Sequence, residues 1–272
     1  MEKMRKNNEL LKDMWRMSIR NLRMMGCVAL SFIIFHLSFS PAAAQTKAEA
    51  DSAYARGEFQ KAIKDYEALL KQGVSADLYY NLGNAYYRTE DITRAVLNYE
   101  RALQLSPGDK DIRFNLQMAR SKTIDKITPE TELFFVTWYR SLANMTSVDG
   151  WAYLALTALA LAIVLALIYL FANAVWLRKL GFFCGIALLL LFVLANVLAN
   201  HQKNDFTENR GAIIMGSAVM VKSTPAADGT DLFILHEGTK VTITDSQMKD
   251  WKQIRVADGK EGWVETKLIE LI

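Results

Sequence analysis

The run GWAYLALTALALAIVLALIYLFANAVWL, residues 150–177, holds 28 consecutive residues without a charge. A second uncharged run of 23 residues, LGFFCGIALLLLFVLANVLANHQ, follows at 180–202. At about 1.5 Å of rise per helical residue, each run exceeds the ~30 Å hydrocarbon core of a bilayer. The sequence therefore predicts two transmembrane helices within residues 150–202, joined by a short cytoplasmic turn at residues 178–179.

The charges around the two runs predict the orientation of this hairpin. The link between the runs carries only positive residues, and short loops rich in Lys and Arg stay on the cytoplasmic side. Both long flanking segments are then expected on the opposite face, with Trp151, Tyr153 and Trp176 at the headgroup level. Neither run contains Asp, Glu, Lys or Arg, which transporters and channels usually place within the membrane. The hairpin is therefore interpreted as an anchor.

The N-terminal segment has the order of a secretory signal. Residues 1–23 carry seven basic and three acidic side chains, residues 24–39 are uncharged, and the alanine triplet 42–44 follows. This pattern predicts a signal peptide over residues 1–44, with Gln45 as the new N-terminus. Export agrees with the charge rule, so we expect a membrane protein whose N- and C-terminal domains both lie on the exported side. An uncleaved N-terminal anchor is the alternative.

The composition excludes several classes of function. The chain has 272 residues, 51% hydrophobic and 22% charged, which is enough for two or three modest modules. Its formal net charge of +3 comes from the leader, because the rest of the chain carries 25 basic and 26 acidic side chains. A near-neutral body has no electrostatic footprint for nucleic acid. Cys27 and Cys184 lie in apolar runs, so neither a disulfide framework nor a metal site is expected from them.

Two segments before the hairpin repeat each other at a constant offset. Gly57, Phe59, Ala62, Tyr66 and Leu70 recur as Glu90, Ile92, Ala95, Tyr99 and Leu103. The second copy also has Leu82, Gly83 and Tyr86 on its first helix, and Ala102 and Pro107 on or after its second. This pattern resembles the tetratricopeptide repeat, whose small residues allow paired helices to approach closely. The resemblance implies an all-α repeat module over residues 45–122, ending in a capping helix from Asp109 to about Lys122.

Such repeats bind peptides or partner helices on the concave surface formed by their first helices. The corresponding protein-binding residues would be Asp77, Tyr80, Asn81, Asn84, Tyr87 and Arg88. The alternative is that these side chains only cover a solvated helix face. The carboxylate clamp of some relatives is not predicted, because Asp51 and Asp111 stand where it requires Asn and Lys. Two repeats and a cap form a short stack, so further cover is expected from a partner, another copy or the membrane.

Residues 123–149 join the repeats to the hairpin. They contain an aromatic-rich apolar stretch made of Leu133, Phe134, Val136, Trp138, Tyr139, Leu142 and Met145. This composition predicts a juxtamembrane amphipathic helix that lies in the outer membrane–water interface. A helix packed against the repeats is the alternative.

The C-terminal segment, residues 211–272, changes to short alternating runs typical of β-strands. Five strands are expected, at residues 218–222, 232–235, 240–244, 251–256 and 262–265. The segment resembles a bacterial SH3-like domain, a small all-β barrel, through Gly238, Thr239, Trp251, Asp258, Gly259, Gly262, Trp263 and Val264. The asparagine-valine-arginine motif of that family is absent, which argues against a cell-wall ligand. The two tryptophans are expected in the core or at the rim of the barrel.

The sequence provides no constellation for catalysis. His36 lies in the leader, His201 at a membrane boundary and His236 in an expected strand, without spacing for a metal site or a triad. There is no glycine-rich phosphate loop and no paired-carboxylate motif. We therefore expect no enzyme activity, no cofactor and no metal.

The order of the modules is more specific than any one motif. A leader, a short tetratricopeptide module, a juxtamembrane helix, a two-span hairpin and an SH3-like domain together resemble the BatE family of the bacterial aerotolerance (Bat) operon. That resemblance implies von Willebrand A-domain membrane proteins as partners, an indirect link to a MoxR-type ATPase, and a role in stress survival. The predicted function is a periplasm-facing protein–protein interaction scaffold. The alternative is an envelope sensor or tether whose SH3-like domain binds peptidoglycan.

Overall fold

A computed structural model describes residues 41–131, 133–208 and 211–272. Most of the predicted signal peptide, residues 1–40, lies outside the described residues. The chain divides into two compact units, Met1–Ala48 and Glu49–Ile272, and the contacts discussed below belong to the second unit.

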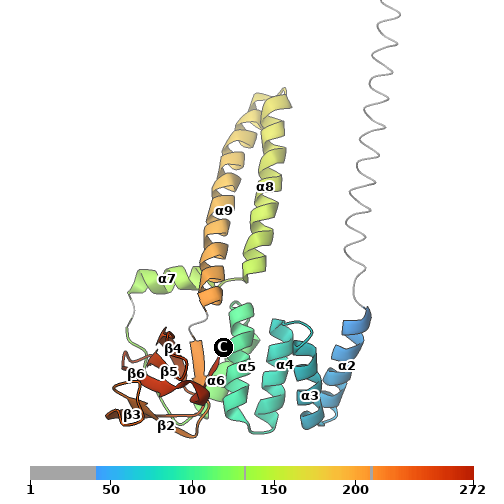
Figure 1. Cartoon of the computed structure of the whole chain (residues 1–272). Helices are drawn as coiled ribbons and strands as arrows, with labels where there is room; N and C mark the ends of the chain where they lie inside the picture. Colours follow the sequence, from blue (N-terminus) through green and yellow to red (C-terminus); the bar gives the residue numbers. More distant parts are fainter. Residues whose placement is uncertain (1–40, 132, 209–210) are drawn as a thin grey trace, which may run out of the picture. The chain divides into compact units, whose positions relative to one another are not determined.

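The repeat region consists of consecutive helices joined by short turns (Figure 1). They are α2 (Pro41–Ala55), α3 (Phe59–Leu70), α4 (Ala76–Arg88), α5 (Ile92–Leu105) and α6 (Lys110–Ser121). Three of these helices begin at side chains that cap free backbone N–H groups. Ser75 accepts from Leu78 N–H, Asp91 from Arg94 N–H, and Asp109 from the N–H groups of Asp111 and Ile112.

The turn between the two helices of each repeat uses the left-handed backbone region. Gly57 has φ 81°, and Glu90, at the equivalent position of the second repeat, has φ 64°. Glycine adopts this conformation without a steric penalty, whereas a residue with a Cβ does not. The same turn is therefore relaxed in the first repeat and strained in the second.

Small residues set the distance between the paired helices. Ala62 and Ala95 are fully buried, and the phenol rings of Tyr66 and Tyr99 occupy equivalent core positions. A Cβ added to Gly83 would lie 2.8 Å from the Tyr99 ring. Gly83 therefore allows the close α4–α5 contact that the repeat pattern predicted.

The helices α8 (Val148–Phe171) and α9 (Val175–Glu208) run side by side as a hairpin (Figure 1). Buried alanines of α8, such as Ala158, face α9, and a Cβ on Gly181 of α9 would lie 2.7 Å from the carbonyl oxygen of Leu165. Large apolar side chains, such as Phe183, point outward. By length and composition, both helices are able to cross a membrane.

The turn of the hairpin is not where the charges predicted it. The helices break between Phe171 and Val175, and Arg178 and Lys179 lie in the first turns of α9. Arg and Lys are good helix formers, whereas Asn, present here as Asn173, is a poor one. The two charged residues therefore separate the uncharged runs in the sequence, but they do not mark the end of a helix.

A short helix, α7 (Phe134–Ala143), packs against the base of the hairpin. The carbonyl oxygen of Ala143 accepts from Trp151 Nε1 at 2.8 Å and from Gln202 Nε2 at 2.7 Å. The opposite face of α7 is apolar and open, with Phe134 84% exposed and Trp138 68% exposed. Among the described residues between α6 and α8, helix is thus confined to residues 134–143.

The C-terminal domain is one antiparallel sheet in the order β3-β2-β6-β5-β4-β1-β7. Its strands are β1 (Gly211–Ile214), β2 (Ala218–Lys222), β3 (Asp231–His236), β4 (Lys240–Asp245), β5 (Trp251–Arg255), β6 (Glu261–Glu265) and β7 (Ile269–Leu271), with a 3₁₀ turn at Thr266–Leu268. The β5–β6 turn contains Gly259 at φ 85°, at the predicted Asp-Gly position. The five expected strands are present, and the expectation of only five is wrong.

The strands that the pattern missed, β1 and β7, pair with each other. Strand β1 does not alternate, because it is buried on both faces. Ala212 and Ile214 belong to the core of the sheet domain, whereas Ile213 belongs to the core of the repeats. A strand covered on both sides is a continuous apolar run rather than an alternating one.

Candidate functional site

The predicted protein-binding residues lie on α4 with different degrees of exposure. Asp77 and Arg88 are exposed, and the other four, Tyr80, Asn81, Asn84 and Tyr87, are half-buried. Arg88 lies over the Phe59 ring, 4.8 Å from its centroid, and Lys122 Nζ lies 4.3 Å from the centroid of Tyr87.

Two of these residues take part in a hydrogen-bond trio that occurs once in each repeat. In the first repeat, Asp51 Oδ1 accepts from Tyr66 Oη at 2.6 Å and from Asn81 Nδ2 at 3.3 Å. In the second, Asn84 Oδ1 accepts from Tyr99 Oη at 2.7 Å and from Asn115 Nδ2 at 2.9 Å. Each trio ties both helices of its repeat to the first helix of the next.

The burial of the two tyrosines keeps them as donors in these trios. Burial raises the pKa of Tyr66, and the hydrogen bond to the Asp51 carboxylate raises it further. Burial also raises the pKa of Tyr99. Both phenols therefore stay protonated over the whole physiological pH range.

The trios change the interpretation of the predicted face. The Asn81 and Asn84 side chains hold the stack together, and Tyr80 Oη accepts from Asn115 Nδ2 at 3.0 Å. The residues most open to a partner are Asp77 and Arg88.

Sequence reasoning missed two exposed apolar residues on the capping helix. Phe114 and Met118 occupy on α6 the positions that Tyr80 and Asn84 occupy on α4, and they are 62% and 38% exposed. Extending the repeat pattern into α6 was the signal that could have found them. An apolar side chain kept open at such a position is available to a partner.

The last repeat is covered by the chain's own C-terminal domain. Ile213 lies in the repeat core, with Met215 and Ile272 packed against it. Arg101 Nη2 donates to Glu270 Oε1 at 3.0 Å and to the Leu271 carbonyl oxygen at 2.6 Å. We expected a partner, another copy or the membrane to cover the last repeat. Strands β1 and β7 of the same chain cover it instead.

Two polar residues on the capping helix α6 explain why the repeat stack does not continue against it. Gln117 and Arg120 stand on α6 where α4 has Gly83 and Tyr86, the positions that pack against the second helix of a repeat. Both are exposed on α6 and face the C-terminal domain across a cavity. Polar side chains at these two positions do not favour packing of another repeat helix, so the stack ends at α6. The C-terminal domain lies there instead.

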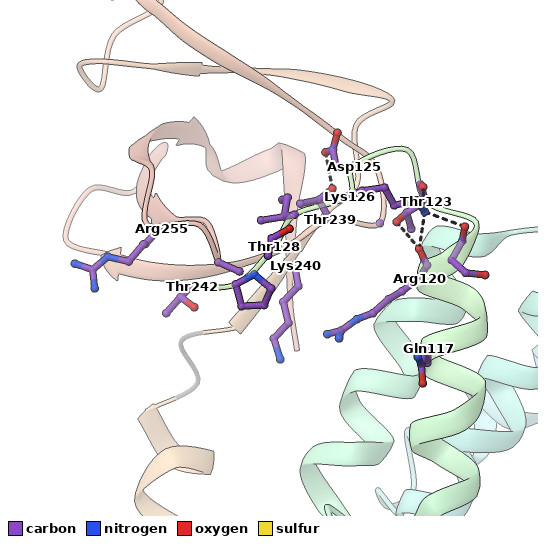
Figure 2. A pocket seen from close by; sticks show the side chains of 15 residues that line it. Gln117, Arg120, Thr123, Asp125, Lys126, Thr128, Thr239, Lys240, Thr242 and Arg255 are labelled. Atoms are coloured by element: carbon purple, nitrogen blue, oxygen red, sulfur yellow. Dashed lines mark hydrogen bonds between the residues drawn. The ribbon is translucent and has the colours of Figure 1, made fainter. Parts of the chain in front are cut away.

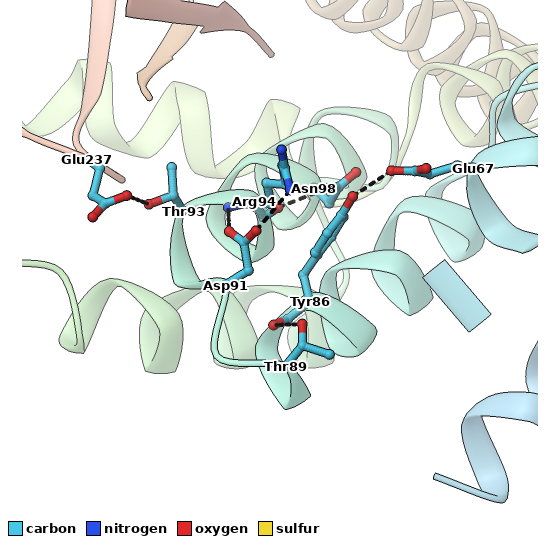
Figure 3. Close-up of polar contacts among 8 residues, drawn as sticks. All are labelled: Glu67, Tyr86, Thr89, Asp91, Thr93, Arg94, Asn98 and Glu237. Carbon is cyan, nitrogen blue, oxygen red and sulfur yellow. Dashed lines mark hydrogen bonds and ion pairs between the residues drawn. The ribbon is translucent and has the colours of Figure 1, made fainter. Parts of the chain in front are cut away.

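A buried carboxylate lies at this junction. Glu100 of α5 is only 3% exposed and pairs with Arg120 of α6 and with Lys240 of β4, the latter at 2.8 Å. Close by, Thr93 Oγ1 donates to Glu237 Oε2 at 3.1 Å (Figure 3). Taking this carboxylate out of water is costly, so loss of either cation would leave a poorly compensated charge in the junction.

A second carboxylate, Asp125, anchors the segment that leaves α6. Its Oδ2 accepts from the His236 N–H at 2.7 Å and from Thr239 Oγ1 at 2.6 Å, and its Oδ1 lies 2.8 Å from His236 Nδ1. Burial acts to raise the pKa of Asp125, but these hydrogen bonds outweigh it and hold the pKa below the ordinary value.

The segment 123–130, here called the strap, lies along the C-terminal domain. Ile127 packs against the core of the sheet, and the Glu130 N–H donates to the Ala257 carbonyl oxygen at 2.9 Å. The first part of the predicted juxtamembrane segment therefore belongs to the junction between the two domains.

The described residues contain no candidate metal centre. Within residues 41–131, 133–208 and 211–272, no three His, Cys, Asp or Glu side chains are grouped as metal ligands.

Comparison with protein families agrees with this architecture. Residues 47–110 match the family model of the tetratricopeptide repeat, and residues 217–270 match that of the bacterial SH3 domain. Both are typically non-catalytic interaction domains, and no enzyme family matched. A comparison with curated proteins gave no match. The chain therefore contains a tetratricopeptide repeat region and a C-terminal bacterial SH3 domain.

Proposed function

We propose that the protein is a membrane-anchored scaffold that binds another protein through the first helices of its repeats. The observation that carries this proposal is the open surface of α4 and α6. Arg88, Phe114 and Met118 present cationic, aromatic and apolar groups on helices of a repeat type that binds peptides. Aromatic, Met and Arg side chains are enriched at protein interfaces.

The hairpin is the proposed anchor. Helices α8 and α9 have the length and the outward apolar side chains that a bilayer requires. The open apolar face of α7 fits the membrane–water interface next to them. With the leader and the positive Arg178 and Lys179, the proposed arrangement has two spans in the bacterial inner membrane and both domains in the periplasm.

The proposed partners follow from the order of the modules. That order is the one implied by the BatE resemblance, so the proposed complex contains von Willebrand A-domain membrane proteins. A MoxR-type ATPase would act on this complex indirectly, in a response to oxygen or other stress.

The concave surface is tested with a substitution that spares the hydrogen-bond trios. Phe114→Ser removes an exposed ring, and Val74→Ser, at a residue 61% exposed in the α3–α4 turn, is the matched control. In-cell crosslinking and mass spectrometry of the tagged full chain should recover fewer von Willebrand A-domain proteins with the first variant only. Equal recovery from both variants would exclude this surface.

The proposed orientation has its own measurement. Single cysteines at Lys179 and at Ser246, in a chain without Cys27 and Cys184, should react with a membrane-impermeant maleimide on opposite sides of the membrane. In cells whose outer membrane is permeabilised and whose inner membrane is intact, labelling of both positions would contradict a cytoplasmic turn.

A second candidate function is peptidoglycan binding by the SH3 domain. It is favoured by an exposed apolar patch formed by Met220, Leu232 and Ile234 on β2 and β3. Purified full-length protein should sediment with sacculi if this function is correct, and Ile234→Ser should abolish sedimentation. Protein that stays in the supernatant would remove this candidate.

A further inference from the structure

A cavity of 710 Å³ lies between the repeats and the SH3 domain, and neither domain forms it alone. Its walls come from the end of α6, from the strap and from strands β4 and β5. In Figure 2, Arg120 extends from α6 toward the SH3 domain, and Lys240 extends from β4 into the space between them. The volume lies within the range of ligand pockets, about 300–1,000 Å³.

Positive charge predominates on the walls of this cavity. Arg120, Lys126, Lys240 and Arg255 line it, whereas Asp125 is the one carboxylate among the described residues of its lining. Asp125 is already bound by the backbone and side chains of the SH3 domain. The field inside the cavity therefore favours an anionic ligand.

Two of these cations retain hydrogen-bond donors. An ammonium group has three donors and a guanidinium five, and Glu100 accepts one from Lys240 and one from Arg120. Because one carboxylate serves both cations, one positive charge remains in excess at this wall. Lys126 donates to the Arg120 and Ser121 carbonyl oxygens at the end of α6, and no carboxylate among the described residues offsets its charge there, whereas Glu261 offsets the charge of Arg255.

The remaining lining residues suit a polypeptide. Thr242 and Thr128 provide hydroxyl groups for backbone atoms, and Pro129 provides an apolar surface for a side chain. We propose that this cavity binds an extended acidic peptide segment whose carboxylates contact Lys240 and Arg120. The site is separate from the open surface of α4 and α6 and exists only while the two domains are docked.

The test uses the full chain in nanodiscs of zwitterionic lipid and a fluorescein-labelled peptide of eight glutamates. Thr242→Glu places a carboxylate on the cavity wall, opposite Arg255 in the β4–β5 pairing. Thr244→Glu makes the same change farther along the same strand, outside the cavity, and is the matched control. We expect Thr242→Glu to weaken binding about tenfold and to reduce its salt dependence, with no change for Thr244→Glu.

Three results would overturn the proposal. Equal binding of an eight-glutamine peptide would exclude charge recognition, and equal loss in both variants would exclude this cavity. Failure of unlabelled octaglutamate to displace the labelled peptide would exclude recognition of the peptide itself.

Two further variants separate this proposal from others. Lys240→Gln keeps a donor for Glu100 and should also weaken binding, with a single cooperative thermal unfolding transition as its folding control. Phe114→Ser should leave octaglutamate binding intact, so failure of the scaffold proposal and failure of this one are distinguishable.

Discussion

Helices α3 and α5 occupy the same place in the two repeats, yet one faces solvent and the other faces the SH3 domain. Both bury the alanine and tyrosine that define the repeat. Their outer faces differ, because Lys64 and Glu67 of α3 are exposed, whereas their counterparts on α5, Leu97 and Glu100, are buried. The Glu67 carboxylate accepts from Tyr86 Oη (Figure 3), whereas Glu100 holds two cations from two elements. Equal position in a repeat therefore does not imply equal environment.

The largest expected effect tests this difference directly. Leu97→Ala should lower the free energy of unfolding by about 2–4 kcal/mol, because it opens a cavity under a side chain only 2% exposed. Lys64→Ala, its counterpart on α3, should change it by less than about 0.5 kcal/mol. Urea titration of the detergent-solubilised chain, followed by hydrogen exchange of α5 amides, measures both. Similar losses would show that α5 is not covered as described.

The Asp125 contact should have a smaller effect that depends on pH. Because the pKa of this carboxyl is lower in the folded chain than its unfolded value of about 3.9, its stabilisation is complete above that value. The stabilisation is lost as the pH falls through the folded pKa. Asp125→Asn should cost about 1–2 kcal/mol at pH 7, and this cost should shrink as the pH falls through the folded pKa.

The matched control for this carboxylate is Asp77→Asn, an exposed position on α4. Stability curves of the wild type and of Asp125→Asn should converge as the pH falls through the folded pKa. A constant difference between these two curves across the pH range would contradict the proposed origin.

Removing the tyrosine hydroxyl from each trio should lower stability, and the loss should be larger in the first repeat. The Tyr66 phenol donates to a carboxylate and the Tyr99 phenol to an amide, and bonds to charged groups contribute more. Tyr66→Phe should cost about 2 kcal/mol and Tyr99→Phe about 1 kcal/mol. Thermal unfolding of both variants with the double variant measures the difference, and a reversed order would refute this explanation.

The smallest expected effect is a gain in stability. Glu90→Gly should relax the left-handed turn of the second repeat and raise the free energy of unfolding by about 1 kcal/mol. The reverse change in the first repeat, Gly57→Glu, should lower it by a similar amount. Urea titration of both variants measures the pair, and a loss with Glu90→Gly would mean that the Glu90 side chain has a stabilising role.

The sequence pattern predicted the repeat helices, the two long apolar helices and most of the strands. The constant offset between the two copies identified the repeat positions of Ala62, Tyr66, Ala95 and Tyr99, and uncharged length identified the two long apolar helices. Helix turns and apolar stripes recur within a few residues, so they can be read along the chain. The same argument gave five of the seven strands.

The candidate site was predicted only in part. Asn81 and Asn84 were expected to face a partner, but their amides bind groups on neighbouring helices, and Phe114 was missed. A side chain on a helix face has the same sequence signature whether a partner, solvent or another helix covers it. The distinction needs the position of Asn115 and Asp51, 31 and 30 residues away from those amides.

The sequence by itself determined the modules, their order and the faces that each repeat buries against the next. The tertiary structure decided that Glu100 is buried, that the strap lies along the SH3 domain at the junction and that β1 joins two cores. Glu100 and Lys240 are 140 residues apart, so no local pattern links them. The local sequence on α5 predicts that Glu100 is exposed to solvent. Only the packing of the distant C-terminal domain buries this side chain and brings Lys240 to it.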